Sequence, residues 1–310
     1  MTQLESATRI DFRPISIEDK ALYDRLLFDG ETRGCEFAFA NLFSWGRTLI
    51  AEIDGQAVIQ TRFGSRCYYP FPLGNGDKRS AIDAILSDSK ARNIPCYIIG
   101  LSESEKETLE GLYPNRFSFK YDEGLYDYVY LIDDLADLKG KKYDGKRNHL
   151  KRFYESYPDF TARPLDECDI SQLQSMVSDW YKSRLEADSE ADFTNEIAAI
   201  ERAFKYRKEL SIDGLALYDK DRVLAVTLGS LLSDDTFDVH FEKARPDVVG
   251  GYAAINREFA CYIRDKYPSV RFIDREEDMS IEGLRRAKRS YHPHHMTKKC
   301  RALAEDRHDL

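Results

Sequence analysis

The sequence predicts a mixed α+β fold made of two similar halves, and three observations lead to this prediction. The chain has 310 residues, a length that suits two domains of about 100–200 residues each. Strand-like segments outnumber those that a doubly wound parallel sheet needs, and in each half three of them follow one another at hairpin spacing. The order of strands and helices in the second half repeats the order in the first half.

The first predicted domain covers residues 1–135. Strands are expected at residues 9–15, 48–55, 56–64, 66–74, 96–102 and 117–132, and helices at residues 16–30, 35–47, 77–93 and 103–113. The dipeptide Asp54-Gly55 is a strong hairpin signal between two of these strands. Ser16 is a suitable N-cap for the first helix, and Gly30 is a suitable stop for it.

The second predicted domain covers residues 159–310 and follows a basic linker and helix at residues 136–158. Strands are expected at residues 160–167, 214–220, 222–234, 236–244, 270–278 and 296–303, and helices at residues 169–187, 192–210, 250–268 and 280–291. In the linker helix, Leu150, Phe153 and Tyr154 share one face, which can pack on a domain. We therefore expect two domains, each with a mixed, mostly antiparallel sheet flanked by helices.

Composition narrows the class of protein and its location. The chain is 42% hydrophobic and 12% aromatic, which excludes wholesale disorder. No apolar run approaches the roughly 18–20 residues that cross a bilayer, so we expect no integral membrane association. The six cysteines are scattered without a CxxC pair, which is typical of reduced packing thiols and indicates the cytoplasm.

The charge is distributed unevenly along the chain. The net charge is −9, yet residues 139–152 hold seven basic side chains and one acid, and residues 285–301 hold seven basic side chains and no acid. Such islands in an acidic chain indicate an anionic, phosphate-bearing partner that is met locally, with tRNA as one candidate. The alternative interpretation is an ordinary solvated charged face.

Two segments carry a resemblance to a known family. They are "KYDGKRNHLKRF", residues 142–153, and "DREEDMSIEGLRRAKRSYHP", residues 274–293. The order of elements in each half resembles the GNAT N-acyltransferase fold, and two copies in tandem resemble the aminoacyl-transferase branch of that superfamily. The two segments are similar to signatures of the phosphatidylglycerol lysyltransferase C-terminal domain family, formerly a domain of unknown function (DUF2156). The resemblance extends from about residue 10 to residue 303.

This resemblance implies an acyl- or aminoacyl-transferase with its working site in the second half. The implied donor is acyl-CoA or an aminoacyl-tRNA, and the acceptor is an amine or a hydroxyl on a lipid, a peptide or a small molecule. Members of the family that modify lipids carry many transmembrane helices before this domain, and the present sequence contains none. A different class remains open, namely a non-catalytic module on a transferase fold that binds a nucleotide or another anionic ligand.

A glycine turn in the second half is a candidate cofactor site. A strand ends near Arg245, and Gly250-Gly251 opens a helix that continues with Tyr252. Free N–H groups and the helix dipole at such a turn attract phosphate, and the resemblance implies that the cofactor pyrophosphate lies there. The alternative is a simple helix start. In the first half, Asp77 follows the equivalent glycines and would repel phosphate, so we expect that domain to be structural.

An acidic cluster at the end of a predicted strand is a candidate catalytic site. The predicted strand at residues 270–278 ends in Glu276, Glu277 and Asp278, and the carboxyl end of a strand is where such sheets bind ligands. One of these carboxylates would deprotonate an attacking amine or hold a cationic amino acid, and Tyr291 would return a proton to the leaving group. The alternative is that Asp278 caps the next helix and the other acids form surface ion pairs.

His240 is the second candidate base, in the strand at residues 236–244. Strict alternation along this strand would place Phe237, Val239 and Phe241 on one face, and Asp238, His240 and Glu242 on the other. A histidine beside a cleft can accept a proton near neutral pH. A histidine satisfied by a neighbouring carboxylate is the alternative interpretation.

Two groups of basic residues are candidate anion ligands. Lys146, Arg147 and Asn148 lie at a predicted helix start, where cations are unfavourable unless an anion is present. Arg285 and Lys288 share one side of the last helix. We expect these two groups to converge on one anion site.

A cluster of three histidines near the C-terminus invites a metal interpretation. His292, His294 and His295 with Cys300 do not match the spacing of a standard zinc site. We therefore predict that no metal is bound.

Overall fold

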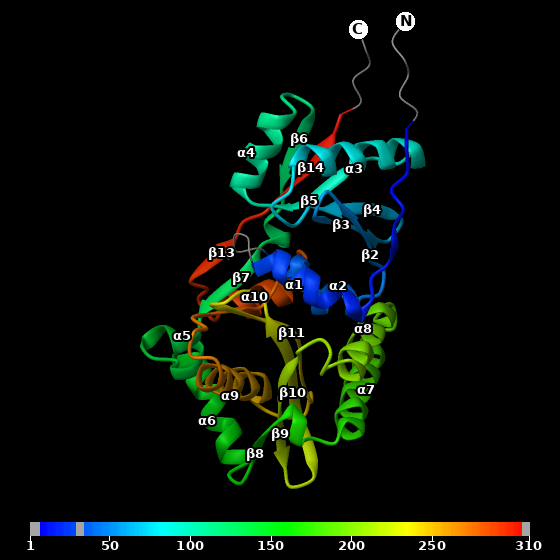
Figure 1. The fold of residues 1–310 in the computed structure, drawn as a ribbon. Helices are drawn as coiled ribbons and strands as arrows, with labels where there is room; N and C mark the ends of the chain where they lie inside the picture. The colour runs from blue at the N-terminus through cyan, green and yellow to red at the C-terminus, as the bar shows by residue number, and fades with distance from the viewer. Residues whose placement is uncertain (1–6, 29–33, 306–310) are drawn as a thin grey trace, which may run out of the picture. The chain divides into compact units, whose positions relative to one another are not determined.

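The computed structural model describes residues 7–28 and 34–305, so the predicted helix stop at Gly30 lies outside the described residues. The chain forms two compact units (Figure 1). One unit comprises the chain up to Tyr126 together with the segment from Thr297 onward, and the other comprises Asp127–Met296. Each unit is described by itself below.

The first unit contains a sheet flanked by helices. Its strands are β1 (Arg13–Pro14), β2 (Leu49–Ile53), β3 (Gln56–Phe63), β4 (Arg66–Pro70), β5 (Tyr97–Leu101), β6 (Phe117–Tyr121) and β14 (Cys300–Ala304). Its helices are α1 (Lys20–Phe28), α2 (Phe39–Ser44), α3 (Lys78–Arg92) and α4 (Glu103–Leu112), with short 3₁₀ turns η1 (Ile17–Asp19), η2 (Cys35–Phe37) and η3 (Glu123–Leu125). The strand order is β1-β2-β3-β4-β5-β14-β6.

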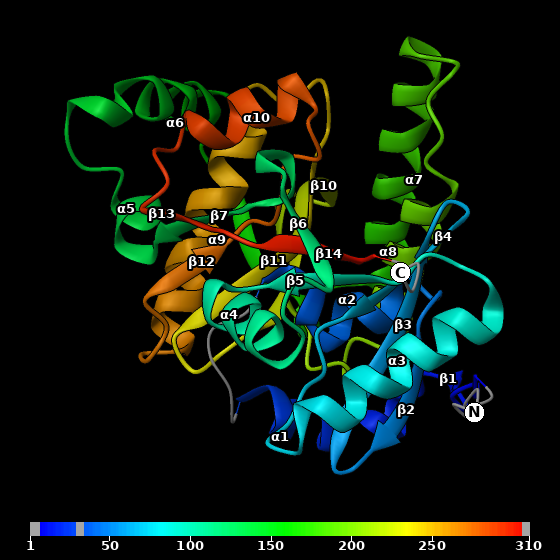
Figure 2. The same cartoon turned by 90° about the horizontal axis from the view of Figure 1, so that it is seen from above.

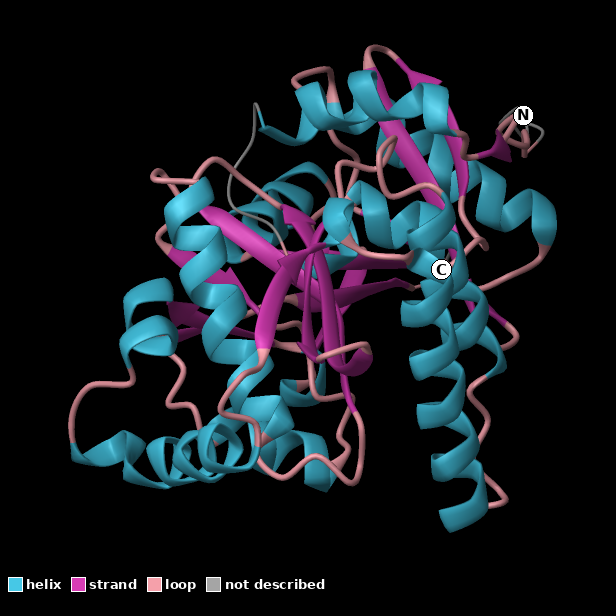
Figure 3. Cartoon of the chain, turned by 90° about the horizontal axis from the view of Figure 1, so that it is seen from below, coloured by secondary structure: helices cyan, strands magenta, loops and turns pink. Residues whose placement is uncertain are grey.

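The second unit has a sheet of the same size. Its strands are β7 (Asp127–Leu131), β8 (Thr161–Pro164), β9 (Asp213–Asp219), β10 (Arg222–Leu231), β11 (Thr236–Ala244), β12 (Phe272–Asp274) and β13 (His295–Thr297), in the order β13-β7-β12-β11-β10-β9-β8. Its helices are α5 (Ile132–Asp137), α6 (Asp144–Ser156), α7 (Ile170–Ala187), α8 (Thr194–Lys205), α9 (Gly251–Lys266) and α10 (Glu282–Arg289), with 3₁₀ turns η4 (Lys141–Tyr143) and η5 (Leu165–Glu167). Figure 3 shows the strands in magenta with helices in cyan around them.

The two sheets repeat one topology, which confirms the predicted fold class. In the first sheet β1 to β4 pair antiparallel in sequence order, and β4 then pairs parallel with β5. In the second sheet β8 to β11 also pair antiparallel in sequence order, and β11 pairs parallel with β12. The predicted hairpin at Asp54-Gly55 joins β2 to β3, and both residues have the positive φ that this turn type requires.

The division between the units differs from the expected one because each sheet takes one strand from a distant part of the chain. β7 was expected to end the first domain, but it pairs with β12 of the second unit. β14 was expected to end the second domain, but it pairs with β5 and β6 of the first unit, and Figure 2 shows it in red beside them. A sequence pattern indicates that a segment is a strand but not which strand it pairs with. The exchange of β7 and β14 between the two sheets was therefore not predicted.

The core of the second unit lies between its sheet and helix α9. Apolar residues of α9, including Ile255, Phe259 and Ile263, are fully or almost fully buried against Phe237 and Ile273 of the sheet. Helix α6 packs on α9, and its Leu150 and Phe153 belong to the same cluster. The core therefore fixes α6, α9 and the C-terminal ends of β11 and β12 as one framework.

Within the described ranges, no helix is both long and apolar enough to span a membrane.

Candidate functional site

A β-bulge in β11 decides which polar side chains meet. Leu228 of β10 lies opposite Phe241, but the next residue, Gly229, lies opposite Val239. His240 is therefore an extra residue in β11, and the alternation of side chains reverses at this point. Position 229 must be glycine, because a Cβ there would lie 2.2 Å from the carbonyl oxygen of Asp238.

The predicted alternation along this strand was therefore wrong beyond the bulge. Asp238 lies opposite Ser230 and shares a face with Phe241, whereas Glu242 shares the other face with Val239. The side-chain contacts agree, because Glu242 meets Asn256 of α9, which packs against the sheet on the same face as Val239. The single polar row expected from the sequence is thus two separate polar groups on opposite faces of the sheet.

The first group, which we call the Glu242 cluster, comprises Glu242, Arg275, Lys146, Tyr291 and Asn256. Arg275 donates a hydrogen bond to Glu242 over 3.0 Å, and the two side chains are only 13% and 11% exposed. The Nδ2 atom of Asn256 donates to the other oxygen of Glu242 over 3.5 Å. Among the described residues, Nη1 of Arg275 and Oδ1 of Asn256 have no hydrogen-bond partner although both atoms are buried.

Two cations of this cluster lie against one aromatic ring. The Nζ atom of Lys146 lies 3.7 Å from the ring centroid of Tyr291, and the Arg275 guanidinium lies 4.9 Å from it. Burial, together with the nearby positive charge of Arg275, lowers the pKa of Lys146 to about 8. Burial also raises the pKa of Tyr291 to about 12. Lys146 is therefore able to exchange a proton near neutral pH, whereas Tyr291 stays protonated.

The second group, which we call the His240 centre, comprises Asp238, His240, Glu276 and Ser230. The Nδ1 atom of His240 lies 3.3 Å from Asp238 Oδ2 and 3.5 Å from Glu276 Oε1, and Nε2 lies 2.8 Å from Ser230 Oγ. Burial raises the pKa of Asp238. Burial alone would lower the pKa of His240, but the charges of Asp238 and Glu276 outweigh it and raise that pKa.

The acidic loop at Arg275–Asp278 is held by its own cations. Asp278 is buried and accepts hydrogen bonds from Arg285, over 2.8 and 3.0 Å, and from Tyr128 over 2.6 Å. Burial alone would raise the pKa of Asp278, but these bonds outweigh it and lower that pKa to about 2, so Asp278 is a weak base. It also accepts from the Ser280 amide in the turn before α10, rather than acting as the N-cap of that helix.

Lys288 also stabilises the acidic loop by hydrogen bonds to its backbone. Its ammonium is buried and donates to the backbone carbonyls of Arg275, Glu276 and Glu277 over 2.5, 3.1 and 2.6 Å. Glu276 itself has a left-handed backbone with φ 57°. The predicted strand at residues 270–278 is accordingly shorter, because β12 stops at Asp274 and the loop begins there.

The predicted anion ligands occupy different surroundings. Arg147 donates to the carbonyls of Leu138 and Gly140 and pairs with Asp144 at the start of α6. Asn148 is exposed. Lys146 lies in the Glu242 cluster, while Arg285 and Lys288 bind the acidic loop, so each of these cations has a protein partner of its own.

The glycine turn at the start of α9 serves close packing. Gly250 has φ 77°, and a Cβ there would lie 2.3 Å from the carbonyl oxygen of His149 in α6. Arg245 donates to the Val223 carbonyl over 2.8 Å and pairs with Asp179 at 3.3 Å. Tyr252 is 44% exposed and accepts a hydrogen bond from Trp180 over 3.0 Å. Gly251 packs on Val248 and Ala244.

In the first unit, the equivalent turn is closed by protein groups. Asp77 is the N-cap of α3 and accepts from the Arg79 amide. The Lys78 ammonium donates to the carbonyls of Pro72 and Gly74. These contacts fill the turn with protein groups, and the structural role expected for this domain stays a prediction.

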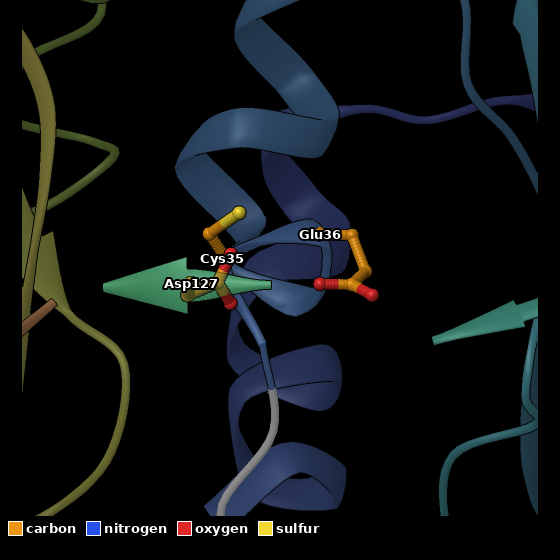
Figure 4. A group of neighbouring side chains, drawn as sticks. All are labelled: Cys35, Glu36 and Asp127. Carbon is orange, nitrogen blue, oxygen red and sulfur yellow. The ribbon is translucent and has the colours of Figure 1, made fainter. Parts of the chain in front are cut away.

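One of the basic residues near the C-terminus also has an acidic partner. Lys299 donates to Glu36 over 2.5 Å. Glu36 lies with Cys35 on η2 (Figure 4). The third residue that Figure 4 labels, Asp127, begins β7 of the second unit. The second basic island is therefore partly neutralised inside the first unit.

Sequence reasoning missed part of both polar groups. Arg275 and Asn256 were not among the candidates, and Glu242, Asp238 and Ser230 were at most members of a strand. Two of these residues could have been suspected from their positions in the sequence. Arg275 directly precedes the predicted acids, and Glu242 follows His240 by two residues. The bulge hid this signal, since it separates Glu242 from His240.

The repeated topology and the polar groups on β11 and β12 define the class of this protein, which has a tandem GNAT-like transferase fold. The chain belongs to the phosphatidylglycerol lysyltransferase C-terminal family, whose model matches residues 29–302. A solved structure of a conserved protein of unknown function from Bacteroides thetaiotaomicron is 34% identical with a TM-score of 0.88, and the match covers 96% of this chain and 100% of that one.

More distant structures share the fold. The C-terminal domain of a putative lysylphosphatidylglycerol synthetase from Agrobacterium fabrum is 12% identical with a TM-score of 0.68, and the match covers 94% of this chain and 93% of that one. L-PGS from Bacillus licheniformis is 14% identical with a TM-score of 0.67, covering 97% and 95%. Among curated proteins, an uncharacterized protein of Mycoplasmoides gallisepticum is 23% identical over 186 residues, so the chain spans 58% of that relative's length.

Proposed function

We propose that this protein transfers an aminoacyl group from aminoacyl-tRNA to an amine or hydroxyl acceptor, and that the reaction takes place at the Glu242 cluster. The family to which the chain belongs is named for a lysyl transfer, and this supports the reaction type. The observation that carries the choice of site is the pair of buried, unpartnered atoms in the cluster. Among the described residues, the donor Nη1 of Arg275 and the acceptor Oδ1 of Asn256 have no hydrogen-bond partner, and a substrate group that enters the cluster would supply one.

The residues of the cluster have the chemical properties that acyl transfer needs. The acceptor attacks the ester carbonyl, and its proton passes to Glu242 or to the neutral form of Lys146, whose lowered pKa of about 8 makes that form accessible. The carbonyl oxygen gains negative charge as the new bond forms, and Arg275 would donate to it. The ester C–O bond then breaks, and the leaving ribose oxygen takes the proton from whichever of Glu242 and Lys146 accepted it.

Catalytic roles were first expected for Glu276, Glu277, Asp278, His240 and Tyr291. The structure bears most directly on two of them, Asp278 and Tyr291. The low pKa of Asp278 weakens its case as a base. The buried Tyr291 keeps its proton and orients Lys146 and Arg275 through its ring. We therefore assign proton transfer to Glu242 and Lys146, and we keep Tyr291 as a positioning residue.

Transfer of label from charged tRNA tests this proposal. The purified protein is incubated with tRNA carrying a radiolabelled amino acid, with phosphatidylglycerol vesicles as a hydroxyl acceptor and a lysine-containing peptide as an amine acceptor. Parallel reactions use labelled acetyl-CoA in place of tRNA. We expect label to move from tRNA to one acceptor, and Glu242→Gln to lower the rate by about 10²–10⁴-fold, the usual loss when a general acid–base group is removed.

Lys151→Gln is the matched control, because Lys151 is an exposed lysine of the same helix as Lys146. It should leave the rate unchanged. Transfer from acetyl-CoA alone would make acyl-CoA the donor. Tight binding of charged tRNA without any transfer would favour the non-catalytic binding module, and an unaffected Glu242→Gln variant would remove the Glu242 cluster from the reaction.

A further inference from the structure

We propose that the His240 centre binds one divalent metal ion of the zinc class, with Asp238, His240 and Glu276 as ligands. These three residues come from β11 and from the loop after β12, all within the second unit. Each offers one ligand atom, and the three atoms lie within 4.8 Å of one another. The sequence predicted no metal because the spacing of His292, His294, His295 and Cys300 fits no standard zinc site. Asp238 and His240 are two residues apart, but Glu276 lies 36 residues further along the chain, so the present three residues form no spacing motif either.

The distances within the group suit a small tetrahedral ion. The His240 Nδ1 atom lies 3.3 Å from Asp238 Oδ2 and 3.5 Å from Glu276 Oε1. Zinc binds nitrogen and carboxylate oxygen at about 2.0–2.2 Å, and neighbouring ligands of a tetrahedral site then lie about 3.3–3.6 Å apart. The side chains would need little rearrangement to bind an ion placed between them.

Asp238 supplies an independent observation that points to a ligand. The residue is 0% exposed, and neither of its carboxylate oxygens has a hydrogen-bond partner within the described residues. A buried carboxylate without hydrogen bonds is costly. The Nδ1 atom of His240 could offer one proton at most, yet it faces the carboxylates of both Asp238 and Glu276. A divalent ion would supply Asp238 with the partner that it lacks, and it would take the imidazole and Glu276 as its further ligands.

Ser230 is placed as an outer partner of the metal-binding imidazole. Its hydroxyl lies 2.8 Å from Nε2 of His240, so a proton on Nε2 can be donated to Ser230. With a proton on Nε2, Nδ1 can present its lone pair to an ion that lies between Asp238 and Glu276, which is the tautomer that a metal requires. Three protein ligands leave a further position for water or another small ligand.

The ion would also support the loop that carries Arg275. Glu276 has a left-handed backbone, which a non-glycine residue adopts at a cost of about 1 kcal/mol or more. A metal bond from Glu276 to β11 would hold that conformation. The His240 centre and the Glu242 cluster lie on opposite faces of β11, so the ion is not itself part of the Glu242 cluster.

Metal binding by the full chain, measured without any substrate, tests the proposal. The protein is stripped with a chelator and titrated with Zn²⁺ against a chromophoric competitor, and Co²⁺ is added in a parallel sample to record its visible spectrum. We expect one Zn²⁺ per chain, a Co²⁺ spectrum of tetrahedral intensity, and a melting temperature that rises with Zn²⁺ concentration.

Two ligand variants, one variant of the outer partner and one control test the assignment of this site. Ser230→Ala should weaken Zn²⁺ binding by about 10–100-fold, as loss of an outer partner does, and His240→Gln and Asp238→Asn should each weaken it further. The control is His294→Gln, because His294 and His295 form an exposed pair with their Nδ1 atoms 2.9 Å apart that could bind metal nonspecifically.

Asp238→Asn also guards against misfolding, because replacing a buried charge by a neutral side chain of the same shape should leave the metal-free melting temperature equal or higher. Undiminished binding in His240→Gln or Asp238→Asn, loss of binding only in His294→Gln, or no binding by the wild-type chain would each overturn the proposal. None of these results depends on the transferase activity.

Discussion

At the scale of single residues, the most informative side chain is Lys146. It lies in the first turns of α6, with its ammonium against Tyr291 and close to Arg275. A cation at a helix start beside another cation is unfavourable unless a negative charge lies nearby, and for this reason the sequence alone predicted an anion near this segment. The structure adds a nearby carboxylate, Glu242, and burial that lowers the lysine pKa to about 8.

The lowered pKa of Lys146 predicts a pH-dependent stability. The pKa falls from 10.5 to about 8 on folding, so between these values the unfolded chain binds the proton and the folded chain does not. Stability from this group is therefore present above pH 10.5 and lost as the pH falls through 8. Lys146→Met should be more stable than the wild type at pH 7, and this advantage should shrink by about 3 kcal/mol as the pH rises to 10.5.

Urea unfolding at several pH values measures this difference. Lys151→Met is the matched control, since Lys151 is 74% exposed in the same helix and its variant should differ from the wild type by a constant amount. A Lys146→Met advantage that does not change with pH would contradict the lowered pKa.

At the scale of elements, local sequence patterns predict where helices lie, whereas contacts between strands decide irregularities such as the bulge at His240. The helix predicted at residues 77–93 is confirmed by α3, and the helix predicted at residues 169–187 is confirmed by α7. Their caps and periodicity are local properties that the sequence displays. The bulge at His240 depends instead on the register between β10 and β11 and on Gly229, so no pattern within β11 alone reveals it.

The same reasoning explains what could be predicted about the site. The segments around Lys146 and Arg275 were identified because charged residues gather there in the sequence. The roles of Asp278 and Lys288 were not foreseen, because their partners are Arg285, Tyr128 and backbone carbonyls that only the folded loop brings together. Glu242 and Asn256 meet through the contact of α9 with the sheet, which is tertiary information.

The contact between α6 and α9 gives a prediction for Gly250. Its φ is 77°, and a Cβ at this position would lie only 2.3 Å from the His149 carbonyl oxygen, so alanine would strain the backbone and force the helices apart. Gly250→Ala should destabilise the protein by about 2–3 kcal/mol. Thermal or urea unfolding measures the change.

Gly145→Ala is the matched control for this prediction. Gly145 lies in α6, and a Cβ there meets nothing within 4 Å. Alanine should leave stability unchanged or raise it by about 0.5–1 kcal/mol, because it favours the helix. Equal effects of the two substitutions would argue against a close approach of α6 to Gly250.

At the scale of the whole molecule, the chain builds two sheets of one topology and completes each with a strand from elsewhere in the sequence. β14 lies between β5 and β6, and its Ala302 is opposite Ile98 on one side and Phe119 on the other. A strand with partners on both sides contributes backbone hydrogen bonds to both neighbours. The last strand of the described chain is therefore central to the first unit.

A proline at Ala302 tests this arrangement. Ala302→Pro removes a backbone donor in the middle of a paired strand, where proline is not tolerated, and should destabilise the first unit by about 3 kcal/mol or more. Amide hydrogen exchange should become faster in β5 and β6, while β9, β10 and β11 serve as the internal reference and keep their protection. Equal loss of protection in both sheets would show that the two units unfold together.

The position of β14 also bears on the order in which the protein is assembled during synthesis. The strands from β1 to β6 leave the ribosome long before Cys300–Ala304 is made, yet β5 and β6 meet through β14 and not through each other. Until then, the edges of these two strands offer unpaired amides and carbonyls that can pair with another chain. The second unit has six of its seven strands, β7 to β12, by residue 274, and only α10 and the edge strand β13 follow, so most of its sheet can form while the first sheet still lacks β14. The half that begins first in the sequence is thus expected to be the half that finishes last.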